Sequence, residues 1–174
     1  MPDLIRDYHL YSRVMTVDTW FRRKVREGKA FEASRRFTSI ADGDKVDVLF
    51  ENPGGSGVEV TFFVVEVNGG AELWPDVLRN VSKDAAGSPM DVMNPNMGSD
   101  RQPKCRVESN GTYSGGTKVH ETVSFGGQKQ FAVGSLAEIG GSAIIPQGNN
   151  VLARIWNMSG SPVNLSVRVI WVEE

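Results

Sequence analysis

The chain has 174 residues, of which 40% are hydrophobic and 23% are charged, and it is long enough for one domain with a substantial core. Its formal net charge of −2 gives no reason to expect the strongly basic face that nucleic-acid binding usually needs, so we expect no nucleic-acid partner. No apolar run approaches the ~20 residues of a membrane span, and the first residues lack a signal-peptide pattern, so we expect synthesis in the cytoplasm.

Nineteen glycines and eight prolines lie mostly in clusters between short apolar runs. This pattern is typical of antiparallel β-proteins, in which tight turns join short strands. The sequence therefore predicts an all-β fold, an antiparallel β-sandwich or single jelly roll of about eight strands with an N-terminal arm. An arm or short helix is expected at residues 1–27, and the jelly-roll-like sandwich domain at residues 28–174.

The N-terminal segment combines aromatic and basic side chains without strand periodicity. Asp18 could cap a short helix that runs to Glu27 and stops at Gly28, although an extended arm fits the pattern as well. A solvated basic face is the simplest interpretation, but interfaces favour aromatic and arginine side chains. The candidate subunit-interface residues are Tyr8, Tyr11, Trp20, Phe21, Arg22, Arg23, Lys24 and Arg26.

Strand patterns begin at Ala30. A first strand is expected around Phe31, and in a second strand, residues 45–50, apolar residues alternate with Lys45 and Asp47, which predicts one buried and one wet face. Residues 58–67 are apolar on both faces, which is typical of a central strand or of one covered by another subunit.

The middle of the chain is less regular. Residues 73–81 predict a strand interrupted at Trp74 and Pro75, since proline is tolerated in sheets at edges, strand starts and bulges. Residues 94–103 predict a long surface loop, a kind of segment that is often functional, although a loop without a role fits equally well.

The strand that contains His120 places Val119 and Val123 on its inward side, and Glu121 falls on the same side. An unpaired buried carboxylate costs several kcal/mol, so Glu121 is expected to find a partner. Arg154 and Arg168 are the candidates. A structural ion pair or a strand-end position is favoured over a catalytic role for Glu121. A further short strand is expected around Phe131 and Val133.

The end of the chain has the clearest pattern. Residues 151–157 and 163–172 are two strand-like runs joined by a turn, and in the second run apolar residues alternate with polar ones. The alternation predicts that Val163, Leu165, Val167, Val169 and Trp171 share a buried face. Because the connecting turn is short, the two runs are expected to pair as a β-hairpin.

Residues with catalytic or metal-binding chemistry are few and scattered. His9 and His120 belong to no metal-binding spacing, Cys105 is the single cysteine, and Asp42 and Asp44 flank a glycine as turn residues do. Neither a nucleophile elbow nor a phosphate-binding loop occurs. The sequence therefore predicts no catalytic residue, no metal and no cofactor, and the protein is not expected to be an enzyme.

Several turn and strand motifs carry a family resemblance. They are residues 28–31, 41–53, 55–57, 111–117, 120–121, 144–152, 157–160 and 170–173. With these motifs the chain resembles small virion proteins of phages and archaeal viruses that are thought to be built on a single jelly-roll-like domain. The resemblance begins at Glu27 and leaves out the first 26 residues. It implies a capsid, capsid-decorating or tail-associated subunit in the virion, acting as a homo-oligomer with other virion proteins and without catalysis.

Two other functions were weighed. A carbohydrate- or host-receptor-binding sandwich module, with a host-surface glycan as partner, would use a receptor loop formed by Trp74, Asn94, Asn96 and Arg101. Burial of Trp74 would count against that function. A metal enzyme of the cupin type is disfavoured, since its site needs clustered histidines and the chain has two histidines in all.

Overall fold

The computed structural model describes residues 20–121, 123 and 144–174. Within these residues the fold is almost entirely β, with one short helix at residues 20–26. The strands are β1 (Ala30–Ile40), β2 (Lys45–Asn52), β3 (Val60–Gly69), β4 (Leu73–Arg79), β5 (Ser82–Ala85), β6 (Ser88–Pro89), β7 (Val92–Met93), β8 (Arg106–Ser109), β9 (Thr112–Ser114), β10 (Thr117–Glu121), β11 (Asn149–Asn157) and β12 (Val163–Glu173). The predicted all-β sandwich is confirmed, and no helix among the described residues is long and apolar enough to span a membrane.

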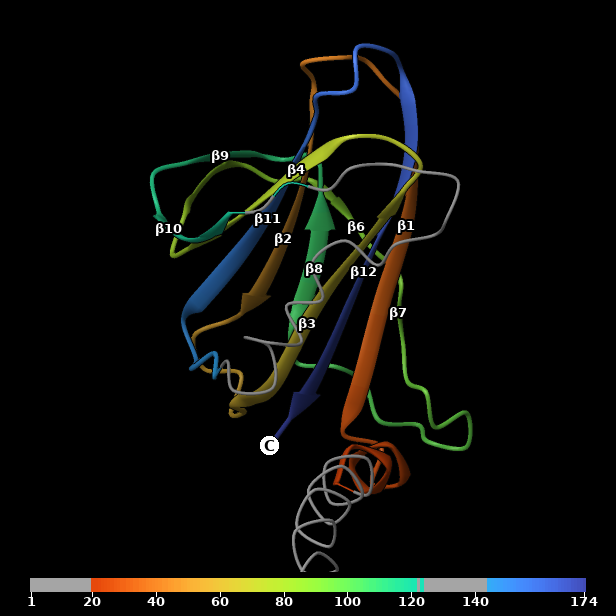
Figure 1. The fold of residues 1–174 in the computed structure, drawn as a ribbon. Helices are drawn as coiled ribbons and strands as arrows, with labels where there is room; N and C mark the ends of the chain where they lie inside the picture. The colour runs from red at the N-terminus through yellow and green to blue at the C-terminus, as the bar shows by residue number, and fades with distance from the viewer. Residues whose placement is uncertain (1–19, 122, 124–143) are drawn as a thin grey trace, which may run out of the picture.

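Two antiparallel sheets face each other (Figure 1). One has the order β3-β12-β1-β7 and the other β10-β4-β11-β2-β8-β6. The first strand, β1, pairs with the last, β12, and the second strand, β2, pairs with the next to last, β11. On their other sides, β12 pairs with β3 and β11 pairs with β4. The remaining partner of β4 is β10. The strands β1 to β4 alternate between the two sheets, and the nested pairing of the long strands is the strand order of a jelly roll.

The segment between β4 and β10 closes one edge of the sandwich. Its strands β7 and β8 pair with β1 and β2, so this segment covers one edge of each sheet, whereas β3 and β10 form the other edges among the described strands. Arg35 of β1 ties the sheets together there, because its guanidinium donates to Ser109 Oγ and to the Pro89 carbonyl, both at 2.6 Å. Covered edges of this kind prevent pairing with the sheets of other molecules.

The core lies between the two sheets and is centred on aromatic side chains. Trp171 of β12 has no exposed surface and lies 5.8 Å from Phe31 and 5.3 Å from Phe50, measured between ring centroids. Phe50 also packs on Phe63 of β3. The predicted buried face of the last strand is therefore confirmed from Leu165 to Trp171, whereas Val163 is half-buried. In β3, Val60 and Val64 are buried on one face and Phe63, Val65 and Val67 on the other, although β3 lies at the edge of its sheet among the described strands.

The predicted C-terminal hairpin is wrong. β11 and β12 follow each other along the chain but belong to opposite sheets, where each lies between two other strands. The connecting turn crosses the end of the sandwich, and the buried amide of Asn157 holds it by donating to the carbonyls of Ile40 and Ser161. The alternation pattern identifies the buried face of a strand, but it does not identify the partner strand.

The outer face of the six-stranded sheet is partly covered by the pair β5-β9. Tyr113 of β9 and Val81, the residue before β5, pack on Leu49 and Leu152, whose side chains point away from the main core. Lys83 of β5 reaches across to the Glu51 carboxylate at 2.8 Å. The outer face of β2 is consequently not uniformly wet, and the expectation that Asp47 faces solvent is wrong, since Asp47 is 4% exposed.

The short helix ends as the sequence predicts. The amide of Lys29 donates to the carbonyl of Lys24 and the amide of Gly28 to that of Val25, which is a Schellman motif with Gly28 at φ +69°. An added Cβ at Gly28 would lie 2.3 Å from Ser99 Oγ, so the site needs glycine for space as well as for its backbone angle. Asp18, the predicted cap, lies outside the described residues.

Candidate functional site

The outer face of the six-stranded sheet is organised in rows that run across β4, β11 and β2. Register places Leu78, Leu152 and Leu49 in one row, which β5 and β9 cover. The next outward-facing row is Asp76, Arg154 and Asp47, and the last is Trp74, Trp156 and Lys45. The face thus changes from apolar and covered, through charged, to aromatic and open.

The aromatic row carries two tryptophans on neighbouring strands. Trp74 is 42% exposed, and its indole N–H donates to Glu72 Oε1 at 2.8 Å. Trp156 is partly exposed, and Lys45 Nζ lies 5.4 Å from its ring centroid in a cation–π contact. The hydrogen bond of Trp74 and the Lys45 ammonium beside Trp156 hold the two rings in place, and the rings together form a partly exposed aromatic patch.

The charged row is fully paired. Arg154 forms a two-pronged ion pair with Asp47, with both N–O distances at 2.9 Å, and this hydrogen bonding raises the pKa of Arg154. Lys118 of β10 lies 3.1 Å from Asp76 Oδ1 and 3.1 Å from Glu121 Oε2, and these carboxylates, first Asp76, raise its pKa. The ammonium of Lys118 consequently stays protonated at neutral pH.

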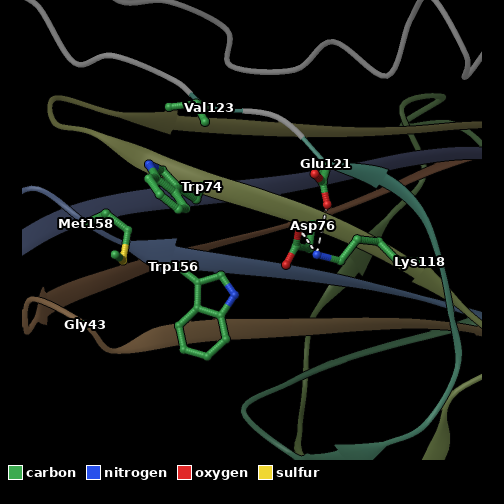
Figure 2. Close-up of a pocket in the computed structure, with 8 residues that line it drawn as sticks. All are labelled: Gly43, Trp74, Asp76, Lys118, Glu121, Val123, Trp156 and Met158. Atoms are coloured by element: carbon green, nitrogen blue, oxygen red, sulfur yellow. Dashed lines mark hydrogen bonds and ion pairs between the residues drawn. The ribbon is translucent and has the colours of Figure 1, made fainter.

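These two rows border a hollow with a volume of about 620 Å³. It is lined by Gly43, Trp74, Asp76, Lys118, Glu121, Val123, Trp156 and Met158. Figure 2 shows Trp74, Trp156 and Met158 on one side and the ion-paired Asp76, Lys118 and Glu121 on the other. Pockets of about 300–1,000 Å³ with aromatic walls and a few fixed polar groups are the usual form of small-molecule sites. Trp156, Asp76 and Lys118 together with Trp74 form the candidate site.

The predicted inward position of Glu121 is wrong, whereas the favoured ion pair and strand-end position are found, because Glu121 is the last residue of β10 and pairs with Lys118. Its side chain is 72% exposed and pairs with Lys118, whereas Arg154 pairs with Asp47 and Arg168 with Glu32 and Glu66. Val119, expected inward, is 50% exposed, and Val123 is exposed as well. The alternation fails here because the pairing of β10 with β4 shifts register between Lys118 and His120, which breaks the two-residue period.

The predicted receptor loop does not form one site with Trp74. Asn94 donates to the carbonyl of Gly28 and Asn96 to that of Arg26, so both amides brace the end of the helix just before β1. Trp74 lies beside Trp156 and Lys45, next to the turn that follows β1. An eleven-residue strand spans roughly 35 Å, and Figure 1 shows the helix and this turn at opposite ends of the sandwich. Arg101 is exposed in the loop, at the helix end.

The candidate interface residues of the N-terminal segment are placed in part. Tyr8 and Tyr11 lie outside the described residues, as do Phe131 and Val133 of the predicted short strand. Trp20 and Phe21 are half-buried, and Arg22, Arg23 and Arg26 are exposed. Lys24 differs from these because it is 6% exposed and forms an ion pair with Glu174, and Trp20 lies over its ammonium. Lys24 therefore attaches the helix to the domain.

Sequence reasoning identified Trp74 and Glu121 but missed the other residues of the hollow. Asp76, Lys118 and Trp156 come from three strands that are distant along the chain, and only the register of β4, β10 and β11 makes them neighbours. A sequence signal exists for Trp156, since it occupies a polar-side position of an alternating strand, where a tryptophan is unusual.

The described residues contain no group of three or more His, Cys, Asp or Glu side chains that could hold a metal ion. No family model matches the chain, and no curated protein matches it. Among solved structures, it is similar to a Yersinia pseudotuberculosis-derived mitogen at 11% identity and a TM-score of 0.36, over 79% of this chain and 83% of that one.

Proposed function

We propose that this protein is a structural subunit of a virion, as a capsid, capsid-decorating or tail-associated protein that acts through symmetric self-assembly and without catalysis. The observation that carries the proposal is the jelly-roll strand order, which agrees with the fold implied by the resemblance to small virion proteins. Covered sheet edges suit such a subunit, because assembly through side chains gives defined contacts where open edges would pair indiscriminately.

The contact surface proposed for assembly is the outer side of the helix at residues 20–26. The helix lies outside the sandwich at one end (Figure 1) and presents Arg22, Arg23 and Arg26. The ion pair between Lys24 and Glu174, together with the bonds from Asn94 and Asn96, fixes the position of the helix, and Arg23 also pairs with Glu27. A fixed basic surface is suited to a carboxylate-bearing surface of another copy or of another virion protein.

The test is quantitative mass spectrometry of particles purified through a density gradient from lysates of cells that make this protein. The proposal predicts that the protein sediments with the particles, in many copies per particle, and stays with them after a high-salt wash. Recovery of the protein only in the soluble fraction would refute the assignment.

A further inference from the structure

We propose that the hollow bordered by Trp74 and Trp156 binds a neutral saccharide, whose ring stacks on the indoles while its hydroxyls bond to Asp76, Lys118 and Glu121. The inference rests on the geometry of this face and not on the assembly proposed above. It assigns a binding site to the end of the sandwich opposite the helix, so one subunit can use both surfaces at once.

The chemistry of a pyranose fits both sides of the hollow. A pyranose ring has a face of C–H groups, which packs on an aromatic plate, and an edge of hydroxyl groups, each of which donates and accepts hydrogen bonds. Trp74 and Trp156 supply the aromatic surface, and their positions opposite each other in the β4–β11 register place them side by side. Asp76, Glu121 and Lys118 supply acceptors and donors on the same side of the sheet.

The charges around the hollow select a neutral sugar. Each cation here already has a carboxylate partner: Lys45 and Arg154 pair with Asp47, and Lys118 pairs with Asp76 and Glu121. An acidic sugar would bring its carboxylate next to these anions and would have to displace one of them from its cation. A hydroxyl group makes no such demand, because it can accept from Lys118 while it donates to a carboxylate oxygen.

A saccharide also fits the hollow better than another protein does. The centres of protein–protein interfaces are depleted of Lys, Asp and Glu. Here Asp76, Lys118 and Glu121 lie in the hollow itself and not on a distant rim. The volume of about 620 Å³ is within the range of sites for compact ligands, and a disaccharide is a ligand of that size.

The experiment is calorimetric titration of the full chain with maltose, lactose, cellobiose, mannobiose and diacetylchitobiose, with sialyllactose as the acidic probe. We expect saturable binding of at least one neutral disaccharide, with lactose bound more tightly than sialyllactose. Trp74→Ala should weaken binding at least tenfold, the change that about 1.4 kcal/mol produces. Asp76→Asn should weaken it as well. Met97→Ala is the matched control, since Met97 is 90% exposed in the loop at the helix end.

Four results would overturn the proposal. The first is the absence of saturable binding for every neutral disaccharide at millimolar concentration, with circular dichroism showing that the protein is folded. The second is equal binding by the Trp74→Ala and Met97→Ala variants. The third is a Trp74→Ala variant that loses an oligomer present in the unchanged protein, which would assign the hollow to a contact between copies. Tighter binding of sialyllactose than of lactose would contradict the preference for neutral sugars.

Discussion

Replacement of Trp171 by alanine should be among the most destabilising single changes in this domain. The side chain is fully buried between Phe31 and Phe50, and its indole N–H donates to Glu173 Oε1 at 3.0 Å. Buried Trp→Ala substitutions cost about 3–5 kcal/mol through lost burial and the cavity that remains. A domain of this size is typically stable by about 5–15 kcal/mol, so the variant is expected to retain only part of its stability.

A second component of that cost can be measured separately with Trp171→Phe, which keeps an aromatic ring but removes the N–H donor. Glu173 has no exposed surface, and its remaining donors are the backbone amides of Lys104 and Cys105. A hydrogen bond to a charged group contributes about 1.5–3 kcal/mol, so this variant should lose an amount in that range. It should therefore fall between the unchanged protein and the alanine variant.

The assay is urea unfolding followed by far-ultraviolet circular dichroism, because tryptophan fluorescence would change with the substitution itself. Trp74→Ala is the control, since the same residue type is 42% exposed there and its loss should cost less than about 1 kcal/mol. Should Trp171→Ala lose less than about 1 kcal/mol, or no more than Trp74→Ala, the β12 face would not be the centre of the core.

Three further predictions follow from the ion pairs and the N-terminal helix. The Lys24–Glu174 pair lowers the pKa of Glu174 from its usual 4.5, so the pair stabilises the docked helix above that pH, and this contribution is lost as pH falls through the lowered pKa. Amide exchange at residues 20–29, corrected for its intrinsic pH dependence, should therefore accelerate below pH 4.5. Lys24→Met should remove this acceleration, and an unchanged acceleration in that variant would assign it to another group. Arg154→Met should lower the free energy of unfolding in urea by about 3 kcal/mol, because it leaves the buried carboxylate of Asp47 with only the Lys45 ammonium, 3.3 Å away, as a cation partner. Adding Asp47→Asn to this variant should restore part of the lost stability. Equal stability of the single and double variants would show that Arg154 and Asp47 are not coupled. A chain that begins at Gly28 should keep its β circular-dichroism signal and its cooperative unfolding, but light scattering should show that it has lost its native oligomer. If the shortened chain is unfolded, the helix belongs to the core of the domain. If its oligomer is unchanged, the helix is not needed for assembly.

The β class and the buried faces of the long strands were predictable from the sequence because both depend on local alternation. Val167, Val169 and Trp171 are buried as the two-residue period requires, and Gly28 ends the helix as its backbone freedom suggests. The predicted interruption at Trp74 and Pro75 is wrong, because β4 runs from Leu73 to Arg79 and pairs with β11 through both residues. The proline is tolerated there since the described pairing of β4 with β10 ends at Asp76, one residue short of it.

Strand pairing and the candidate site were not predictable in the same way. β11 lies between β4 and β2 in one sheet, and β12 lies between β3 and β1 in the other. The alternation of apolar and polar residues in each strand would be the same in either sheet, so it does not identify these neighbours. Burial of Asp47 depends on Arg154 and on the covering pair β5-β9, which are distant in sequence. A bulge in β10 moved Val119 and Glu121 to the surface, and no residue in that strand marks its position in the sequence.

Electron microscopy of purified particles, at a resolution that allows the sandwich to be fitted, tests the central claim most directly. The account predicts copies of the jelly-roll domain at symmetry-related positions, with the helix at residues 20–26 in the contact between a copy and its neighbour. Particles that show no repeated density of this shape, or whose contacts leave the helix in solvent at every copy, would contradict it.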